Sequence, residues 1–380
     1  MSGTSRDRGS CRSVLFKKIS IVLYICMDET STQGKKTVRI SLDAMGGDFA
    51  PRSEIQGAIE ALQAANNRFE VVFIGPEDEI EKVLAEYNAD HLNFSIVNAT
   101  QVIDMHDSPV SALREKKDST IAVGLKLHKE RKTDAFVSTG NTGAVVSAST
   151  LMLGRLHRVS RPTIGAFFPS EEGVTLLLDA GAVTDCKPHF LHEFAIMGSI
   201  YAQLMFNRTN PKIGLLNIGE EEGKGDELTK SAYKLLEKSS LNFIGNIEGR
   251  DVLKGKADVV VCDGFTGNVM LKFAESIIGV LKNKFTSYAE RGLRQKIWMG
   301  IMRGTLRNIL KEFDYQEYGG VPLLGVKGIT IIGHGGSTPK AIKNMILKAD
   351  EMVMRNINQR IESAMDIMQT VPASDISSTT

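Results

Sequence analysis

The sequence predicts an α/β fold in which helices cover both faces of a doubly wound, mainly parallel sheet. Short runs of β-branched and other apolar residues recur along the chain, most end in a glycine-containing turn, and a helix-like segment follows. The runs are apolar throughout rather than alternating, which is typical of strands buried on both faces of a parallel sheet. Strands that alternate with helices in this way predict two helical layers around one sheet.

Eight strands are expected from these runs. In chain order they are Thr37–Leu42, Glu70–Ile74, Phe94–Val97, Ala135–Ser138, Val174–Leu178, Ile213–Ile218, Asp258–Cys262 and Ile329–Ile332. Three prolines occupy positions where a first helical turn accepts proline: Pro51, Pro188 and Pro339. Asp226, and Ser337 or Thr338, are suitable N-cap residues because their side-chain oxygens can accept backbone N–H bonds.

Length and composition narrow the classes of protein that fit the chain. Its 380 residues are 42% hydrophobic and 24% charged, which is typical of a globular protein with one large domain or two modest ones. A formal net charge of +1 argues against a general nucleic-acid binder, which usually carries a large basic excess. No apolar run approaches the roughly 20 residues that span a bilayer. The cysteines are too widely spaced for a disulfide framework or a zinc ribbon: Cys11, Cys26, Cys186 and Cys262.

The chain is expected to divide into a catalytic domain and two terminal extensions. Residues 1–36 hold basic side chains before a short apolar stretch but lack a cleavage site, and we interpret them as a disordered extension. Met27 is a second candidate start. The α/β catalytic domain is expected over residues 37–352, and its least regular part, 280–320, is predicted to be a basic amphipathic helical subregion. Residues 353–380 are expected to hold the end of a C-terminal helix and a disordered tail.

The glycine turns indicate an anion-binding site. Six turns that follow predicted strands begin at Gly46, Gly140, Gly181, Gly219, Gly264 and Gly333. Backbone N–H groups in such turns and at helix N-termini bind anions without a dedicated cation. In doubly wound folds the ligand lies beyond the carboxyl ends of the strands, so we expect all six turns along one edge of the sheet. Neither the G-x-x-x-x-G-K-[ST] nor the G-x-G-x-x-G motif occurs, which favours a small anion over ATP or NAD.

Polar side chains recur in and beside these turns, and they are the candidate site residues. The set is Asp43, Asn141, Thr142, Asp185, Lys187, Asn217, Lys224, Asn268 and His334, together with the backbone of Gly46, Gly47 and Gly143. Asn and Thr side chains can donate to a phosphate or to a developing oxyanion, or they can simply cap turns. Lys187 and Lys224 can neutralise charge on a phosphate, although a solvated lysine has the same sequence appearance.

Two other kinds of site are weakly indicated. Cys186 lies beside Lys187, which could lower the pKa of its thiol, and Cys262 ends a strand, but neither lies in a nucleophile motif. A buried structural cysteine is the commoner case. His189 and His192 could share a helix face as metal ligands, but no third ligand follows at a recognisable spacing, so no metal is expected.

One segment suggests a surface partner. Residues 282–311 carry eight basic side chains and one acid, Glu290. Apolar residues are interleaved with them at helical spacing, and the candidate contact residues are Trp298, Ile301, Met302, Arg303 and Arg307. This pattern suits an anionic membrane surface or an acidic partner protein. It equally suits a helix pair packed on the core or on a second subunit, with its basic face in water.

A series of ordered motifs resembles the phosphate acyltransferase (PlsX) family from about residue 38 to about residue 352. The motifs are Asp43–Asp48 with Ala50 and Pro51, Lys116–Ser119, Gly140–Ala144, Asp185–Pro188, Gly214–Glu222, Gly245–Asn246, Gly249–Asp251, Val261–Val269 and Tyr318–Gly320. Together these motifs are highly specific, although any one alone would not be. The chain departs from the family pattern at Val183, where Asn is usual, and at Gly336, where Ser is usual, so side-chain roles at these positions are not carried over.

The resemblance implies a fold and a reaction. The implied fold is Rossmann-like and similar to that of phosphotransacetylases. The implied reaction transfers a long-chain fatty acyl group from acyl carrier protein to inorganic phosphate, and the acyl phosphate then feeds a membrane acyltransferase that acts on glycerol 3-phosphate. Members of the family are typically cytoplasmic, peripherally membrane-associated homodimers. Phosphate is a substrate, and no cofactor is expected.

The residues and the resemblance agree on a mechanism in which bound phosphate attacks the thioester carbonyl directly. We expect Lys187, Lys224 and the backbone N–H groups of the glycine turns to hold phosphate, and His334 to protonate the departing thiolate. The amides expected to orient phosphate or the oxyanion are those of Asn141, Asn217 and Asn268. The alternatives are a phosphotransacetylase-type enzyme that acts on a small acyl-CoA, a hydroxyacid dehydrogenase, and a non-catalytic peripheral membrane scaffold.

Overall fold

The structure, a computed structural model, describes residues 37–310 and 315–369. Its centre is one sheet of eleven strands in the order β3-β2-β1-β4-β11-β10-β5-β6-β9-β7-β8. The strands are β1 (Val38–Asp43), β2 (Phe69–Gly75), β3 (Phe94–Asn98), β4 (Ala135–Ser138), β5 (Thr163–Ser170), β6 (Gly173–Leu178), β7 (Ile213–Leu216), β8 (Phe243–Ile247), β9 (Val259–Val261), β10 (Val321–Leu324) and β11 (Ile329–Ile332). Most neighbouring strands are parallel, so the predicted α/β fold is confirmed.

The sheet consists of two groups of parallel strands that run in opposite directions. The first group is β3, β2, β1, β4 and β11, and the second is β6, β9, β7 and β8. Three antiparallel pairings, β11 with β10, β10 with β5 and β5 with β6, reverse the direction between them. The expectation that all six glycine turns lie along one edge is therefore wrong. Only Glu171 and Glu172 connect β5 to β6, and a two-residue connection joins antiparallel strands.

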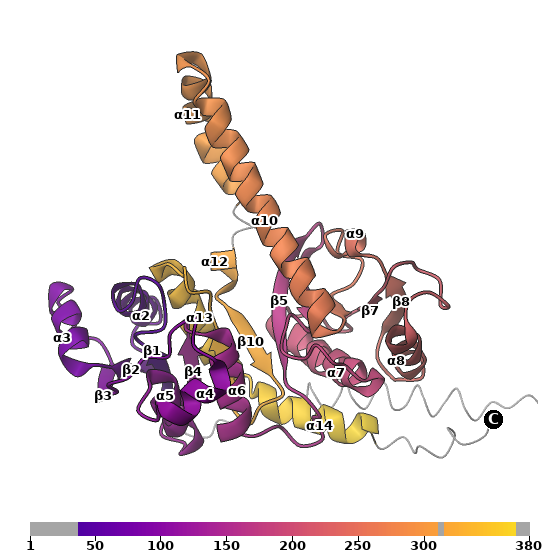
Figure 1. Ribbon diagram of the computed structural model, residues 1–380, viewed down its shortest axis with the longest axis horizontal. Coiled ribbons are helices and arrows are strands. Elements are labelled where there is room, and N and C mark those ends of the chain that lie inside the picture. The colour runs from indigo at the N-terminus through magenta and orange to yellow at the C-terminus, as the bar shows by residue number, and fades with distance from the viewer. Residues whose placement is uncertain (1–36, 311–314, 370–380) are drawn as a thin grey trace, which may run out of the picture.

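Helices cover both faces of the sheet (Figure 1). They are α2 (Arg52–Ala64), α3 (Glu77–Glu86), α4 (Pro109–Glu115), α5 (Thr120–Lys129), α6 (Thr142–Met152), α7 (Pro188–Met205), α8 (Glu227–Glu237), α9 (Gly249–Val252), α10 (Gly264–Ala289), α11 (Leu293–Leu310), α12 (Tyr315–Tyr318), α13 (Pro339–Met354) and α14 (Ile357–Gln369). Val259 and Val261 of β9 pack in the core cluster that includes α7 and α13. Val260 packs in the other cluster, with Leu271 of α10 against it. Burial on both faces explains why the strand sequences are apolar throughout.

Several sequence signals for single elements are confirmed. The strand expected over Ala135–Ser138 has those bounds. Pro188 and Pro339 occupy the first turns of α7 and α13, and Asp226 caps α8 by accepting the backbone N–H of Thr229 at 2.8 Å. Three strands, β5, β8 and β10, were not predicted. β5 and β10 contain proline and β8 contains glycine, and these residues weaken the sequence pattern of a strand.

The helices α10 and α11 form a two-helix projection, here called the hairpin, that rises from the body of the molecule (Figure 1). α10 has 26 residues and α11 has 18, and together they hold most of the segment predicted to be helical and basic. Large apolar side chains of the hairpin are exposed, with Ile301 68% and Trp298 55% exposed. Met302 and Arg303 are exposed as well, whereas the side chain of Arg307 lies outside the described part of the chain.

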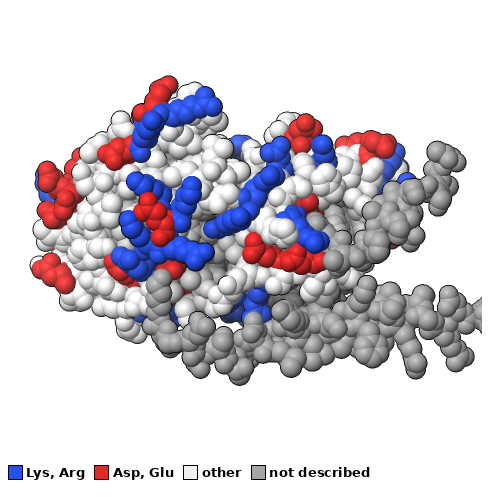
Figure 2. Space-filling view, turned by 90° about the horizontal axis from the view of Figure 1, so that it is seen from below, with Lys and Arg blue, Asp and Glu red and all other residues white. Residues whose placement is uncertain are grey.

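Three further features concern the chain ends, the helices as membrane spans and the surface charge. Residues 1–36 and 370–380, expected to be an extension and a tail, lie outside the described ranges. Among the helices that the structure describes, none is long and apolar enough to cross a membrane. The end of the molecule opposite the hairpin gathers Lys and Arg side chains near its middle, with acidic side chains among them (Figure 2).

Candidate active site

A cavity of about 500 Å³ lies between the two halves of the sheet. The turns after β4 and β11 line it from one side, and the turn after β6 and the start of α10 line it from the other. Parts of β5, β10 and α12 complete the wall. Glycine turns from both strand groups therefore meet at one cavity, although the two groups run in opposite directions.

The cavity is amphipathic. Its apolar lining includes Ile164, Ala166, Phe167, Leu271, Val321 and Ile332. Its polar and charged lining is Asp48, Thr142, Asn268, Lys272, Glu275 and His334. A cavity of this kind suits a ligand that has an apolar portion joined to a polar reacting group. Three of the predicted site residues, Thr142, Asn268 and His334, are brought together here.

The start of α10 touches the turn after β6 backbone to backbone. A Cβ atom on Gly267 would lie 1.9 Å from the carbonyl oxygen of Asp179, and one on Gly181 would lie 3.1 Å from Nδ2 of Asn268. Gly181 has a φ of +134°, a conformation that favours glycine. Within the described residues no protein group bonds the Asn268 amide, so this amide is available to a ligand.

Asp179 shapes the turn that faces Asn268. Its carboxyl group is buried and accepts three hydrogen bonds, from the backbone N–H groups of Ile164 at 2.8 Å and Val183 at 2.6 Å and from the hydroxyl of Thr163 at 3.0 Å. Burial raises the pKa of Asp179 to about 6, and the hydrogen bonds oppose that rise. Val183 contributes its backbone to this turn, so the departure from the family pattern at that position leaves the turn intact.

His334 enters the cavity from the turn after β11. Its Nδ1 accepts the backbone N–H of Gly336 at 3.1 Å. A neutral imidazole that accepts at Nδ1 carries its proton on Nε2. Since the bond comes from a backbone N–H, the Gly336 departure does not remove it.

Asn141 and Gly143 have structural contacts that a ligand would have to replace. The Asn141 side chain caps α6 by accepting the N–H of Ala144 at 3.0 Å, and its Nδ2 donates to the carbonyl oxygens of Asp104, Met105 and Asp107 at 3.1–3.2 Å. Its amide is thus fully bonded within the protein. A Cβ atom on Gly143 would lie 2.7 Å from Cγ of Pro109, so close packing accounts for this glycine.

A second pocket of about 350 Å³ lies on the other side of the α10 start. Asn217 lines it together with Asp226, Thr229, Cys262, Asp263 and Thr266. The Nδ2 of Asn217 donates to the carbonyl oxygen of Lys224 at 3.0 Å, which places Lys224 at the border of this pocket. Lys187, Lys224 and Asp185 have exposed side chains and line neither pocket.

The N-terminus of α10 separates the two pockets. Asp263 caps it by accepting the backbone N–H of Thr266 at 2.9 Å, and Asp263 and Thr266 line the second pocket. Asn268 and Lys272, further along α10, line the first. The partial positive charge of this helix N-terminus favours the binding of an anion beside it.

Two buried carboxyl groups support the turn after β1. Asp43 accepts the hydroxyl of Ser138 at 2.7 Å, and Glu54 of α2 accepts the hydroxyl of Thr139 at 2.9 Å. Burial raises the pKa of both groups, that of Glu54 to about 7. Gly46 and Gly47 lie directly against them, because a Cβ atom would lie 2.8 Å from Oδ2 of Asp43 or 2.4 Å from Oε1 of Glu54.

The two weaker candidate sites are a cysteine nucleophile and a histidine metal site. Burial raises the pKa of the Cys186 thiol to about 12 and also raises that of Cys262, so the expected lowering by Lys187 does not occur. Both thiols are protonated at neutral pH, which makes them poor nucleophiles. In the described part of the chain no three His, Cys, Asp or Glu side chains are placed to hold a metal ion, so His189 and His192 have no third ligand there.

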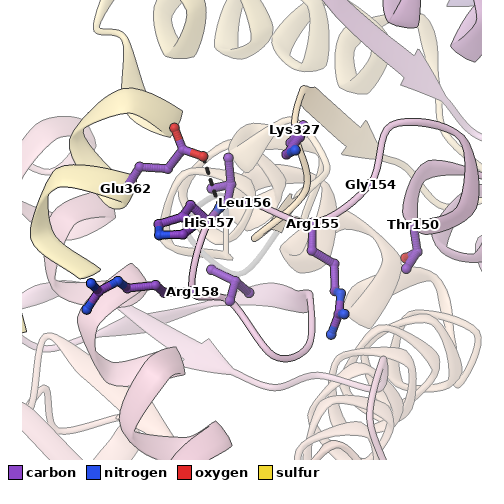
Figure 3. A pocket seen from close by; sticks show the side chains of 9 residues that line it. Thr150, Gly154, Arg155, Leu156, His157, Arg158, Lys327 and Glu362 are labelled. Atoms are coloured by element: carbon purple, nitrogen blue, oxygen red, sulfur yellow. Dashed lines mark hydrogen bonds between the residues drawn. The ribbon is translucent and has the colours of Figure 1, made fainter. Parts of the chain in front are cut away.

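A further pocket of about 540 Å³ is basic but does not focus its charges. Lys327 and Arg155 line it, and Glu362 accepts the backbone N–H of His157 at 3.0 Å (Figure 3). Arg158 points away from Arg155 in Figure 3 and pairs with Asp366. Because the cations diverge, this pocket is a poorer anion site than the α10 N-terminus.

Comparison with known proteins identifies relatives along most of the chain. The family model described as "Fatty acid synthesis protein" matches residues 38–360. A phosphate acyltransferase of Dictyoglomus turgidum is 46% identical over 326 residues, which cover 85% of this chain and 96% of the relative. A phosphate acyltransferase of Chlorobaculum parvum is 47% identical over 331 residues, which cover 85% of this chain and 97% of the relative.

Solved structures with the same fold are much more distant in sequence. A phosphotransacetylase from Streptococcus pyogenes superimposes with a TM-score of 0.57 at 15% identity, covering 90% of this chain and 98% of that one. The EutD phosphotransacetylase from Staphylococcus aureus has a TM-score of 0.52 at 15% identity, covering 92% and 99%. These likenesses confirm the predicted phosphotransacetylase-like fold, and at such identity they concern the fold alone.

Proposed function

The chain belongs to the phosphate acyltransferase family, and we propose that it transfers a long-chain fatty acyl group from acyl carrier protein to inorganic phosphate. Membership makes the chain an acyltransferase enzyme of fatty acid synthesis. The proposal adds three points to this: the carrier protein as donor, the long acyl chain, and the use of the product, acyl phosphate, in glycerophospholipid synthesis.

The observation that carries the proposal is the amphipathic cavity beside the N-terminus of α10. A fatty acyl thioester needs an apolar wall for its chain, and Phe167 and Leu271 contribute to such a wall. The thioester carbonyl and phosphate need hydrogen-bond donors, and Thr142 and Asn268 line the same cavity. A small acyl group would leave most of the apolar wall without a partner.

In the proposed reaction a phosphate oxygen attacks the thioester carbonyl carbon. A carbon–oxygen bond forms, the carbon–sulfur bond breaks, and the carrier thiolate leaves. The Asn268 amide would donate to the tetrahedral oxyanion, and His334 would relay to the thiolate the proton that hydrogen phosphate gives up, so the imidazole ends the reaction unchanged. Phosphate is already a competent nucleophile, so positioning supplies most of the rate gain.

The other predicted residues take supporting places in this proposal. Lys272 is a cation in the cavity wall itself and would balance charge on phosphate. Lys224 borders the second pocket, and Lys187 follows Cys186, whose thiol packs against the turn at the start of α10. Both lysines would attract phosphate toward the α10 N-terminus. Asp43 would hold the Gly46–Gly47 turn rather than touch phosphate.

The hairpin is the proposed contact surface. Trp298 and Ile301 are exposed together with Arg303, a combination that suits the surface of an anionic membrane. We place the enzyme in the cytoplasm, peripherally associated with the membrane, where acyl phosphate would reach a membrane glycerol-3-phosphate acyltransferase. Acyl carrier protein and a second copy of the chain are the other proposed partners. Reversal of Arg303 and Arg307 to Glu that leaves both vesicle binding and carrier-protein kinetics normal would show that the hairpin has a structural role.

The test is turnover of palmitoyl-carrier protein by the purified chain, with and without phosphate, while free carrier thiol and acyl phosphate are followed. We expect both products to require phosphate and palmitoyl-CoA to be a poor donor. Efficient use of acetyl-CoA instead would favour a phosphotransacetylase-type enzyme. Thiol release without acyl phosphate would indicate a thioesterase, and vesicle binding without any turnover would indicate a membrane scaffold.

A further inference from the structure

Three of the glycine turns meet at Gly47. A Cβ atom on Gly47 would lie 2.4 Å from Oε1 of Glu54, 3.1 Å from Oγ1 of Thr139 and 3.2 Å from the carbonyl oxygen of Gly335. These contacts join the turns after β1, β4 and β11. The backbone N–H of Asp48 also donates to the Gly335 oxygen at 2.8 Å. Asp48 and Gly335 line the cavity, so this junction borders it.

Glu54 stabilises the junction by accepting hydrogen bonds from two of its turns. Its side chain is fully buried, its Oε1 accepts the Thr139 hydroxyl at 2.9 Å, and its carboxyl group accepts the backbone N–H of Gly47. Removing these acceptors would leave the N–H of Gly47 and the buried hydroxyl of Thr139 without partners. Glu54 therefore sets the relative positions of the Gly47 and Thr139 turns.

The second carboxylate oxygen of Glu54 has no partner. Oε2 is buried and makes no hydrogen bond, and no Lys, Arg or His of the described residues pairs with Glu54 or with Asp43 beside it. Asp43 is the charged neighbour that acts on Glu54, and helix α13, which packs against α2, contributes none. A buried carboxylate that lacks a cation is stabilised by taking up a proton.

We propose that Glu54 is a positioning residue which takes up a proton when phosphate binds in the cavity. The proton comes from solvent and binds at Oε2, while Oε1 keeps the two turns in place. An anionic phosphate and an ionised Glu54 would repel each other through the low-dielectric interior, and protonation of Glu54 removes that repulsion. The inference rests on the proposed function, because it takes phosphate to be the anion in the cavity.

Isothermal titration calorimetry with inorganic phosphate measures the proton directly. Titrations at pH 7.5 in PIPES and in Tris, which differ in ionisation enthalpy, give the number of protons bound with phosphate. The pKa of Glu54 is raised to about 7 by burial, so wild type should take up about 0.75 proton more than Glu54→Gln, which has no group to protonate. The phosphate ion's own titration is common to both proteins and cancels in this difference.

The pH dependence of the KM for phosphate is the second measurement. The ratio of wild-type to Glu54→Gln KM should rise by up to about 25-fold between pH 6.5 and 8.5, because ionised Glu54 opposes binding only in the wild type. Glu193→Gln is the matched control: Glu193 is also buried and also has a raised pKa, but it bonds Ser160 away from the cavity. This control should behave as wild type in both experiments.

Glu54→Ala separates positioning from charge. It removes the acceptor for Gly47 and Thr139, so its KM for phosphate should exceed that of Glu54→Gln at every pH, while the ratio of the two KM values should stay constant with pH. Equal proton counts in wild type and Glu54→Gln, or a KM ratio constant within twofold, would overturn the inference. If the wild type made no acyl phosphate at all, the proposed function would fail first, and that outcome is separate from equal proton counts in an active enzyme.

Discussion

Replacing Gly267 by alanine tests whether the start of α10 must lie against the turn after β6. The new Cβ atom would lie 1.9 Å from the carbonyl oxygen of Asp179, and opening this contact to even 3.0 Å moves the backbone of α10 by about 1 Å. Overpacking of this kind costs about 1–3 kcal/mol of unfolding free energy. Because Asn268 is the next residue, the same movement should lower kcat/KM by up to about 100-fold, a loss that a 1 Å misplacement can cause.

The same helix contains a matched control. A Cβ atom on Gly279 would meet no other atom within 4 Å, so Gly279→Ala adds only helix propensity and should stabilise the protein by about 0.5–1 kcal/mol. The assay is phosphate-dependent release of carrier thiol, with thermal unfolding followed by circular dichroism. Wild-type kcat/KM in Gly267→Ala, or equal losses in both variants, would refute the assignment of the α10 start to the active site.

Three further predictions concern stability and surface contacts. Burial raises the pKa of Glu54 in the folded protein to about 7, above its value in the unfolded chain, so ionisation of Glu54 destabilises the fold as pH rises. Between pH 5 and 8.5, wild type should therefore lose about 2.5 kcal/mol of unfolding free energy relative to Glu54→Gln, as measured by urea denaturation. Asp179→Ala should lower the unfolding free energy by about 3 kcal/mol or more, since three hydrogen-bond donors lose their acceptor; an unchanged denaturation midpoint would contradict this. Trp298→Glu should weaken binding to anionic vesicles at least about tenfold in a flotation assay; unchanged flotation with an altered elution volume would assign the hairpin to a subunit interface.

Much of the fold was predictable because its signals are local. Apolar runs before glycine turns located most strands, and Pro188, Pro339 and Asp226 marked helix starts because capping and proline chemistry act within one turn. Strand direction is not local. The reversal at the β5–β6 connection passes unnoticed in the sequence because β5 itself, with Gly165 and Pro169, does not have the pattern of a strand.

The site was predictable only where its residues lie on turns. Thr142, Asn268 and His334 were found because they sit beside glycines after strands. Glu54 was missed because a glutamate in the first turn of a helix has the same sequence appearance whether it faces solvent or a buried turn. Asn141 has the residue type of an anion ligand, but its bonds to three carbonyl oxygens arise from a loop distant in sequence, which no local pattern reports.

Because α10 is long and begins at the cavity, a small rotation at its start produces a large displacement at the tip of the hairpin. A straight helix of 26 residues spans about 39 Å, so a rotation of about 5° at its base displaces its far end by about 3 Å. Conversely, a lipid surface or a second chain bound to the tip of the hairpin would fix the orientation of α10. It would thereby fix the angle at which Asn268 and Lys272 face the substrate. Anchoring the tip would therefore tune catalysis without any contact near the reacting atoms.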